Sequence, residues 1–276
     1  MENGDESLLS LTRIVRYHVS GSTTCTGYCQ PGTMLPAPQI RVLLVTAESA
    51  DWTGELQSVL LATGAFTTVD SFPADLSTPS LSFLSNYTAV LVWQCSLFAS
   101  ASSLGDVLAE YWNGGGSVVA TGLASQCLPD NLQGKFGTIS NGYMLIDWSA
   151  PAEFPADSLG TVLEPESPLM NGVKSLTAVN GWRSTGAVIN GGVVVARWAS
   201  NGRPLVVRGT RAGRPLAVIN IWPIPLFPGL PTSWVGNGAS LLRNGLLYSV
   251  CAPCSAGSFS AAGENADAED SVPCKM

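Results

Sequence analysis

Residues 41–48 read RVLLVTAE, a continuous apolar run that predicts a buried β-strand. An amphipathic stretch, 53–62, follows it and ends at Gly64, as a helix with a glycine stop does. A short strand is expected around 67–70, before a connection rich in proline and serine. This stretch therefore predicts a strand, a helix and a second strand in succession.

The same alternation continues downstream. A second apolar run, TAVLVW, occupies 88–93, and a helix is expected at 102–112 with Asn113-Gly114-Gly115-Gly116 as its stop. A third run, SVVATG, follows at 117–122. Apolar strands that alternate with helices are typical of a parallel sheet covered on both faces, so this half resembles a flavodoxin-like α/β fold.

The later part of the chain changes to short β-rich pieces separated by turn signals. Strands are predicted at 193–198, 205–208 and 216–222, with Asn201-Gly202 in the first tight turn. They should form an antiparallel meander, and a last helix is expected at 239–248. The predicted fold class is α/β, a flavodoxin-like parallel sheet with an added antiparallel meander and cysteine-rich ends.

Composition excludes several classes of protein. The 276 residues carry a formal net charge of −7, and only 12% of them are charged. Acidic residues gather at the two ends, so the nearly neutral middle gives no support to nucleic-acid binding. No apolar run approaches the ~18 residues of a membrane span. The first residues lack the features of a signal peptide, so we expect either a cytosolic protein or a chain whose front is missing.

The cysteines are unevenly placed, and five of the seven lie near the ends of the chain. Cys95 and Cys127 follow neighbouring predicted strands, so a disulfide or two buried thiols is preferred to a catalytic thiol. Four of the others have paired spacing that would also suit a structural zinc. All seven are disulfide candidates: Cys25, Cys29, Cys95, Cys127, Cys251, Cys254 and Cys274.

Several stretches together resemble the class I glutamine amidotransferase-like superfamily, in its noncatalytic trehalose-utilisation-type branch. The resemblance covers about 40–250 and is carried by RVLLVTAE, YTAVLVW, LAEYWNGGGSVVATG, RPLAVINIWPI and GASLLRNGLLY. It implies a nucleophile on the elbow after SVVAT and a histidine after the last strand. Here Gly122 occupies the elbow, and the only histidine is His18, upstream of the first strand. The triad that the family would supply is therefore absent.

The two ends carry a second resemblance. TCTGYCQPGTMLPAP, at 23–37, resembles the close of an ephrin-receptor-like cysteine-rich repeat, and CAPCSAGSFSAAG, at 251–263, resembles the opening of the next. This favours disulfides over zinc at the terminal cysteines. It also implies an extracellular or cell-surface location, with which the sequon Asn86-Tyr87-Thr88 agrees.

One ligand site is predicted, at the carboxyl ends of the parallel strands, where open α/β sheets bind their ligands. Its expected lining is Glu48, Asp51, Gln94, Cys95, Thr121 and Gly122. Glu48 and Asp51 are expected to cap the following helix rather than to act as acid or base. No catalytic residue, metal ligand or cofactor is assigned.

Two other groups of side chains suggest binding but are given structural roles. Trp52, Trp182 and Trp222 could stack on a sugar or anchor an interface, although core packing is preferred. The arginines near the meander could clamp anions, although solvated charge beside the turns is preferred; they are Arg197, Arg203, Arg208, Arg211 and Arg214.

The sequence thus divides into an N-terminal segment at 1–38 with the end of a cysteine-rich repeat, an amidotransferase-like domain at 39–250, and the start of a repeat at 251–276. The first functional hypothesis is a noncatalytic binding or spacer module of a larger cysteine-rich extracellular protein, with an unidentified protein or carbohydrate ligand. The alternatives are a hydrolase or lyase acting on a sugar or amide at the crevice, and an intracellular scaffold with a structural zinc.

Overall fold

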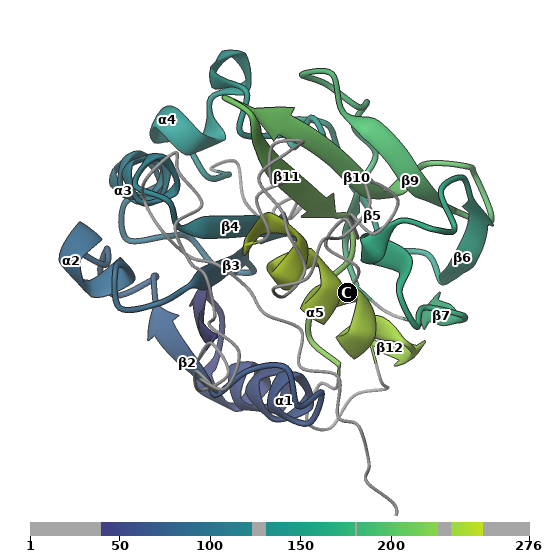
Figure 1. Ribbon diagram of the computed structural model, residues 1–276, viewed down its shortest axis with the longest axis horizontal. Helices are drawn as coiled ribbons and strands as arrows, with labels where there is room; N and C mark the ends of the chain where they lie inside the picture. Colours follow the sequence, from purple (N-terminus) through teal and green to yellow (C-terminus); the bar gives the residue numbers. More distant parts are fainter. Residues whose placement is uncertain (1–39, 123–130, 180, 226–232, 251–276) are drawn as a thin grey trace, which may run out of the picture.

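The computed structural model describes residues 40–122, 131–179, 181–225 and 233–250. Within these residues a ten-stranded sheet runs in the order β12-β7-β6-β9-β10-β11-β4-β3-β1-β2 (Figure 1). Six of the seven cysteines and both predicted ephrin-like repeats lie outside the described residues, so those predictions are not tested.

One half of the sheet is parallel, and its strands follow the predicted runs. The spatial order is β2-β1-β3-β4-β11, which is the flavodoxin order, and the predicted fold class is confirmed. The side chains of β1, β3 and β4 are almost all buried, as a central strand with two covered faces requires. The bounds are β1 Arg41–Ala47, β2 Thr68–Pro73, β3 Ala89–Gln94, β4 Ser117–Thr121 and β11 Arg214–Ile219.

Helices cover both faces of this parallel half. α1 (Ala50–Leu61) and α5 (Gly238–Val250) pack into the core on one face. α3 (Ala101–Asn113) covers the other, together with the short α2 (Leu81–Leu84) and α4 (Gly134–Gly137). Each face of the sheet therefore has its own hydrophobic core.

The sequence of α3 shows why it forms where it does. Leu104, Leu108 and Trp112 recur at helical spacing, and all three are buried. The Ser100 hydroxyl accepts a hydrogen bond from the Ser103 amide at the first turn, and the helix ends at Gly114.

The N-terminus of α1 differs from the prediction. Ser49 is the N-cap residue, and its hydroxyl accepts a hydrogen bond from the amide of Trp52 at 3.5 Å. Glu48 precedes the cap, and Asp51 lies in the first turn, where it can only favour the helix dipole. The expectation that these two acids cap the helix is therefore wrong, because the intervening serine does so.

The antiparallel half is built around the predicted meander. β9 (Val193–Trp198) and β10 (Pro204–Arg211) pair with each other, and β10 pairs with β11. β11 then pairs in parallel with β4, so it belongs to both halves and joins them into one sheet. Beyond β9 the sheet continues through β6 (Asp157–Val162), β7 (Leu176–Ala178) and β12 (Trp234–Gly236).

The two turns of the meander differ. Between β9 and β10 the Trp198 amide donates to the Arg203 carbonyl, so the loop is longer than a two-residue Asn-Gly turn. Between β10 and β11 only Ala212 and Gly213 intervene, with φ of 48° and 75°. Two consecutive residues with positive φ make a type I′ turn, which matches the twist of the flanking strands.

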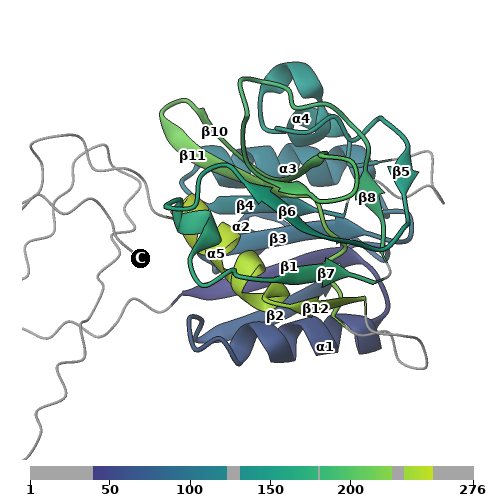
Figure 2. The same cartoon turned by 90° about the vertical axis from the view of Figure 1, so that its right-hand side faces the viewer.

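A second sheet has two short strands, β5 (Ala152–Glu153) and β8 (Arg183–Ser184). Figure 2 shows both at the end of the large sheet toward which β1 runs. Two 3₁₀ turns, η1 (Ile139–Asn141) and η2 (Pro168–Met170), complete the elements of the described ranges. None of the helices in those ranges is long and apolar enough to cross a membrane.

Candidate functional site

The predicted site residues come together at the carboxyl edge of the parallel strands. Ala47 and Gln94, the last residues of β1 and β3, are paired neighbours, so Glu48 and Cys95 follow them side by side. The amides of Cys95 and Ser96 both donate to the Ala47 carbonyl, at 3.1 and 2.8 Å. In the order 2-1-3-4-5 this pair of strands is the switch point, at which ligands of such sheets bind.

Glu48 is a half-buried carboxyl group at this point. Its Oε1 accepts a hydrogen bond from the Ser49 amide at 3.1 Å, and Oε2 is buried with no hydrogen-bond partner among the described residues. Burial raises the pKa of Glu48 to about 7, while hydrogen bonds from Ser49 and the Cys95 side chain act in the opposite direction. Near neutral pH this group can therefore both donate and accept hydrogen bonds.

Cys95 lies half-buried beside that carboxyl group and hydrogen bonds to it. Its predicted disulfide partner, Cys127, is outside the described residues, so the pairing stays a prediction. Asp51 is exposed on the first turn of α1 and does not share the buried environment of Glu48. Asp51 therefore does not belong to the site.

The elbow after β4 is closed. Thr121 is fully buried, and its hydroxyl donates to the Ile221 carbonyl. Gly122 has a φ of 53°, and a Cβ there would lie 3.2 Å from Pro223 and 3.3 Å from the Trp222 ring. The elbow position thus has the left-handed backbone that suits glycine, no nucleophile, and the segment after β11 packed against it.

Gln94 contacts Asn131, a residue that the sequence analysis did not place at the site. It is fully buried, and its Nε2 donates to the Asn131 Oδ1 at 3.5 Å. Asn131 in turn donates to the Trp148 carbonyl at 2.7 Å. No periodicity marks Asn131, and the contacts join segments far apart in the chain, so only the structure could reveal it.

The three candidate tryptophans differ in how deeply they are buried. Trp222 is part of the core, as preferred, whereas Trp52 and Trp182 are half-buried against it. Trp182 also contacts the exposed ring of Phe154, with centroids 4.6 Å apart and the ring planes tilted by 52°. An accessible aromatic pair is therefore present, although Trp222 is not part of it.

Three of the five arginines near the meander bind groups of the protein itself. Arg208 binds Glu164 through two hydrogen bonds, of 2.6 and 2.7 Å. Arg214 donates to carbonyl groups at the C-terminal end of α3, and its guanidinium lies 4.3 Å from the Trp112 ring. Arg211 stacks on Tyr143 at 3.7 Å. Solvated charge beside a turn is therefore the wrong description of Arg211 and Arg214, since both pack on aromatic rings.

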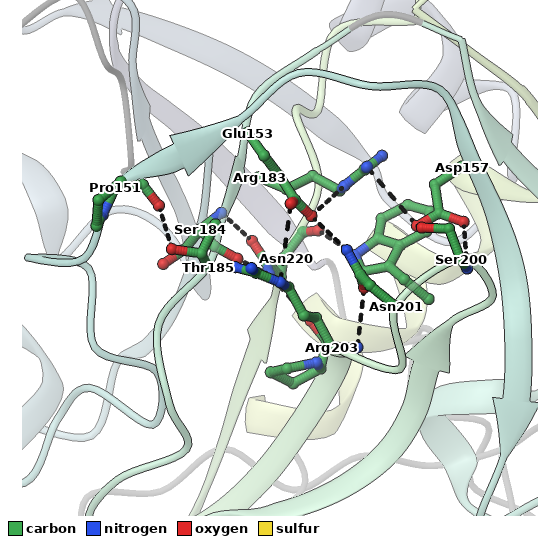
Figure 3. Close-up of polar contacts among 12 residues, drawn as sticks. Pro151, Glu153, Asp157, Arg183, Ser184, Thr185, Ser200, Asn201, Arg203 and Asn220 are labelled. Carbon is green, nitrogen blue, oxygen red and sulfur yellow. Dashed lines mark hydrogen bonds and ion pairs between the residues drawn. The ribbon is translucent and has the colours of Figure 1, made fainter.

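A buried polar cluster around Arg183 was not predicted from the sequence (Figure 3). Arg183 is 1% exposed, and its guanidinium lies 3.7 Å from both Glu153 and Asp157 and 4.5 Å from the Trp198 ring. Burial would raise the pKa of Asp157, but hydrogen bonds from Ser200 and other donors, with the charge of Arg183, lower it. The two carboxylates balance the charge of Arg183, which joins β8 to the meander. Its three guanidinium nitrogens are buried and have no hydrogen-bond partner among the described residues.

Asn220 supports the same region. Its Oδ1 accepts from the Ser184 amide at 2.8 Å, and its Nδ2 donates to the carbonyls of Ser184 and Pro204, both at 2.9 Å. One buried amide thus satisfies backbone groups of β8 and β10. Asn220 directly follows β11, so its hydrogen bonds to Ser184 connect the two-stranded sheet to the large sheet.

Comparison with known proteins rests on structure. No protein-family model matches the sequence, and no curated protein matches it. Two cytoplasmic proteins of Salmonella typhimurium are similar in structure, STM3548 with a TM-score of 0.55 and STM1381 with 0.53. Each is 16% identical over 76% of this chain and 99% of its own. A Bacteroides uniformis protein described as ThuA-like has a TM-score of 0.50 at 14% identity, over 81% of this chain and 96% of its own.

The fold is ThuA-like. At these identities the likeness establishes the fold alone, and it supports at that level the resemblance drawn from the sequence. The ThuA-like fold places Glu48, Cys95 and Gly122 along one edge. Among the residues described, no three His, Cys, Asp or Glu side chains gather as metal ligands, and the cysteines of the zinc hypothesis lie outside them.

Proposed function

We propose that this ThuA-like domain is a noncatalytic binding module whose ligand binds at the carboxyl edge of the parallel strands, beside Glu48 and Cys95. The observation that carries the proposal is the closed elbow, where Gly122 provides no nucleophile and packs against Trp222 and Pro223. The sequence contains a single histidine, His18, upstream of β1. Acyl transfer by a triad needs a nucleophile in contact with a histidine. The elbow after β4 provides no nucleophile, so this triad cannot form there.

The chemistry of Glu48 favours a neutral polar ligand. A carboxyl group with a pKa of about 7 can donate to one ligand atom and accept from another near neutral pH. Hydroxyl and amide groups suit it, whereas an anion would face repulsion from the ionised form. We therefore propose a sugar or an amide as the ligand class. The extracellular or cell-surface location remains a prediction from the sequence.

The test is a titration of ¹⁵N-labelled protein with glucose, N-acetylglucosamine, acetamide and acetate, followed by chemical shifts. We expect the neutral compounds to shift the amide signals of Ser49 and Ser96. Glu48→Ala should abolish the shifts, Glu48→Gln should retain them, and Asp51→Asn should be silent because Asp51 is exposed and outside the proposed site. Shifts confined to the opposite edge of the sheet would contradict the proposal.

One observation favours a second candidate function, a hydrolase acting through Cys95. The thiol hydrogen bonds to Glu48, so an ionised carboxylate could take its proton while the sulfur attacks an amide carbonyl. The leaving amine would receive that proton, and water would release the acyl group from sulfur. Ammonia release from glutamine or acetamide that disappears in Cys95→Ser and after alkylation with iodoacetamide would establish this function and refute the noncatalytic one.

A further inference from the structure

One surface turn of the chain carries the sequence Asn-x-Thr. Residues 86–88 read Asn-Tyr-Thr, and no other asparagine of the chain is followed two positions later by serine or threonine. This pattern is the acceptor site for N-linked glycosylation in secreted proteins. The structure shows how the folded chain would accommodate a glycan at Asn86.

Asn86 is exposed, in the turn between α2 and β3. Because this turn precedes β3, it lies at the amino ends of the parallel strands. Glu48 and Cys95 follow the carboxyl ends of β1 and β3, at the opposite edge of the sheet. A glycan at Asn86 therefore requires no rearrangement of the fold and lies away from the proposed ligand site.

The hydrogen bonds of the Asn86 side chain tolerate the loss of one hydrogen. Its Nδ2 donates to the carbonyls of Ser82 and Phe83, both at 3.1 Å. The Phe83 carbonyl also accepts from the backbone amide of Asn86 at 3.2 Å. A glycosylated Nδ2 retains one N–H, which can bind Ser82 while the backbone amide serves Phe83. Attachment of a sugar thus leaves neither carbonyl unpaired.

An aromatic ring lies three residues before the asparagine. The hydrogen bond from the Asn86 amide to the Phe83 carbonyl closes one helical turn, and side chains three residues apart share a face of such a turn. Phe83 is 38% exposed, and its ring lies 5.5 Å from Phe72 and 5.6 Å from Tyr87 between centroids. These contacts hold α2 beside β2, the last strand of the sheet (Figure 1). The Phe83 ring is therefore held in place, with part of its surface open beside Asn86.

We propose that Asn86 carries an N-linked glycan whose first sugar packs its C–H face against the ring of Phe83. Nδ2 forms a C–N bond to the anomeric carbon of an oligosaccharide that is carried on a lipid diphosphate. The C–O bond to the diphosphate breaks, the lipid diphosphate leaves, and Nδ2 releases one proton to solvent. Contact with the ring removes apolar surface of both groups from water. The proposal requires passage through a secretory compartment, in agreement with the location predicted from the sequence.

The experiment secretes the full chain, fused to a cleavable signal peptide, from cultured eukaryotic cells. We expect one glycan, which peptide N-glycosidase removes while converting Asn86 to an aspartate that peptide mass spectrometry detects. Asn86→Gln and Thr88→Ala should abolish the glycan, whereas Thr88→Ser should retain it, because the acceptor pattern takes either hydroxyl residue. Asn171→Gln is the matched control, at an exposed asparagine followed by Gly-Val, and should keep the glycan.

A second measurement locates the first sugar. Removal of the glycan should lower the Tm of the wild type by about 1–4 °C, the effect of one aromatic contact in a domain of this size. Phe83→Leu keeps an apolar side chain on α2 but removes the ring, and should abolish this shift. Leu81→Ala, at a side chain 39% exposed on the same helix, is the control and should keep it. Enzymatic removal changes Asn86 equally in all three proteins, so that change cancels in the comparison.

Glycosylation can also be measured without folding, because translation of the full chain in the presence of microsomes reports it as a shift in gel mobility. A chain that enters the microsomes or is secreted without a glycan on Asn86 would overturn the proposal. An equal Tm shift in the wild type and Phe83→Leu would refute the contact with the ring. Asn86→Gln should leave the response of Ser49 and Ser96 to neutral compounds unchanged, so failure of one proposal does not imply failure of the other.

Discussion

Glu48 couples the stability of the fold to pH. Burial raises its pKa from 4.5 to about 7, so the folded state retains a proton that the unfolded chain has already released. A raised pKa of an acid stabilises the fold at low pH, and that contribution is lost as the pH rises through 7. The full shift would be worth about 3 kcal/mol, which partial exposure reduces to about 1–2 kcal/mol.

We therefore predict that the wild-type free energy of unfolding falls by about 1–2 kcal/mol between pH 5 and pH 8, relative to Glu48→Gln, which cannot ionise. Urea unfolding of both proteins at the two pH values measures the difference. Asp51→Asn removes an exposed carboxylate of the same region and should follow the wild type. Parallel pH dependences of wild type and Glu48→Gln would show that Glu48 has an ordinary pKa.

At the residue scale, the sequence could identify a side chain where topology alone brings it to the site. Glu48, Cys95 and Gly122 were predictable because the ends of parallel strands share an edge of the sheet. Asn131 and Arg183 were not, since their partners lie on segments that only the packed fold brings close. The environment that raises the pKa of Glu48 is likewise a property of the packed fold.

At the scale of elements, the long periodic segments were predicted well. β9 begins and ends where expected, and α3 differs from its prediction by one residue at each end. β5, β7, β8 and β12 have only two or three residues, too few for a periodic pattern, so the sequence did not indicate them. The second role of β11, beside β4, depends on a pairing that no local pattern encodes.

The turn between β10 and β11 contains an unfavourable residue. Ala212 has a φ of 48°, a left-handed conformation that costs a residue with a Cβ roughly 1 kcal/mol, and its side chain is exposed. Asparagine tolerates this conformation, and Asn-Gly is the preferred type I′ pair. Ala212→Asn should therefore raise stability by about 0.5–1 kcal/mol and the Tm by about 1–4 °C.

Thermal unfolding followed by circular dichroism measures this change. Ala199→Asn, at an exposed position without positive φ in the other turn, is the matched control and should give no gain. Ala212→Val should lower the Tm, because a β-branched side chain is disfavoured at positive φ. A Tm of Ala212→Asn at or below that of the wild type would show that the turn does not have this geometry.

At the scale of the whole molecule, β11 decides how the two halves hold together. It pairs with β10 in the meander and with β4 in the parallel half, so hydrogen bonds continue across the sheet without a domain boundary. The core on each face contains side chains from both halves. The meander is thus part of one cooperative unit and not a separate appendage.

The last prediction concerns the limits of this unit. Among the described residues, 40–250 supply both cores. The flanking sequences carry cysteines, glycines and acids without apolar periodicity. Limited proteolysis should therefore leave a product of about residues 38–250, and that fragment, made alone, should unfold at the same urea midpoint as the full chain. Cleavage that occurs first within Val193–Ile219 would mean that the meander opens separately, and the single-sheet description would then fail.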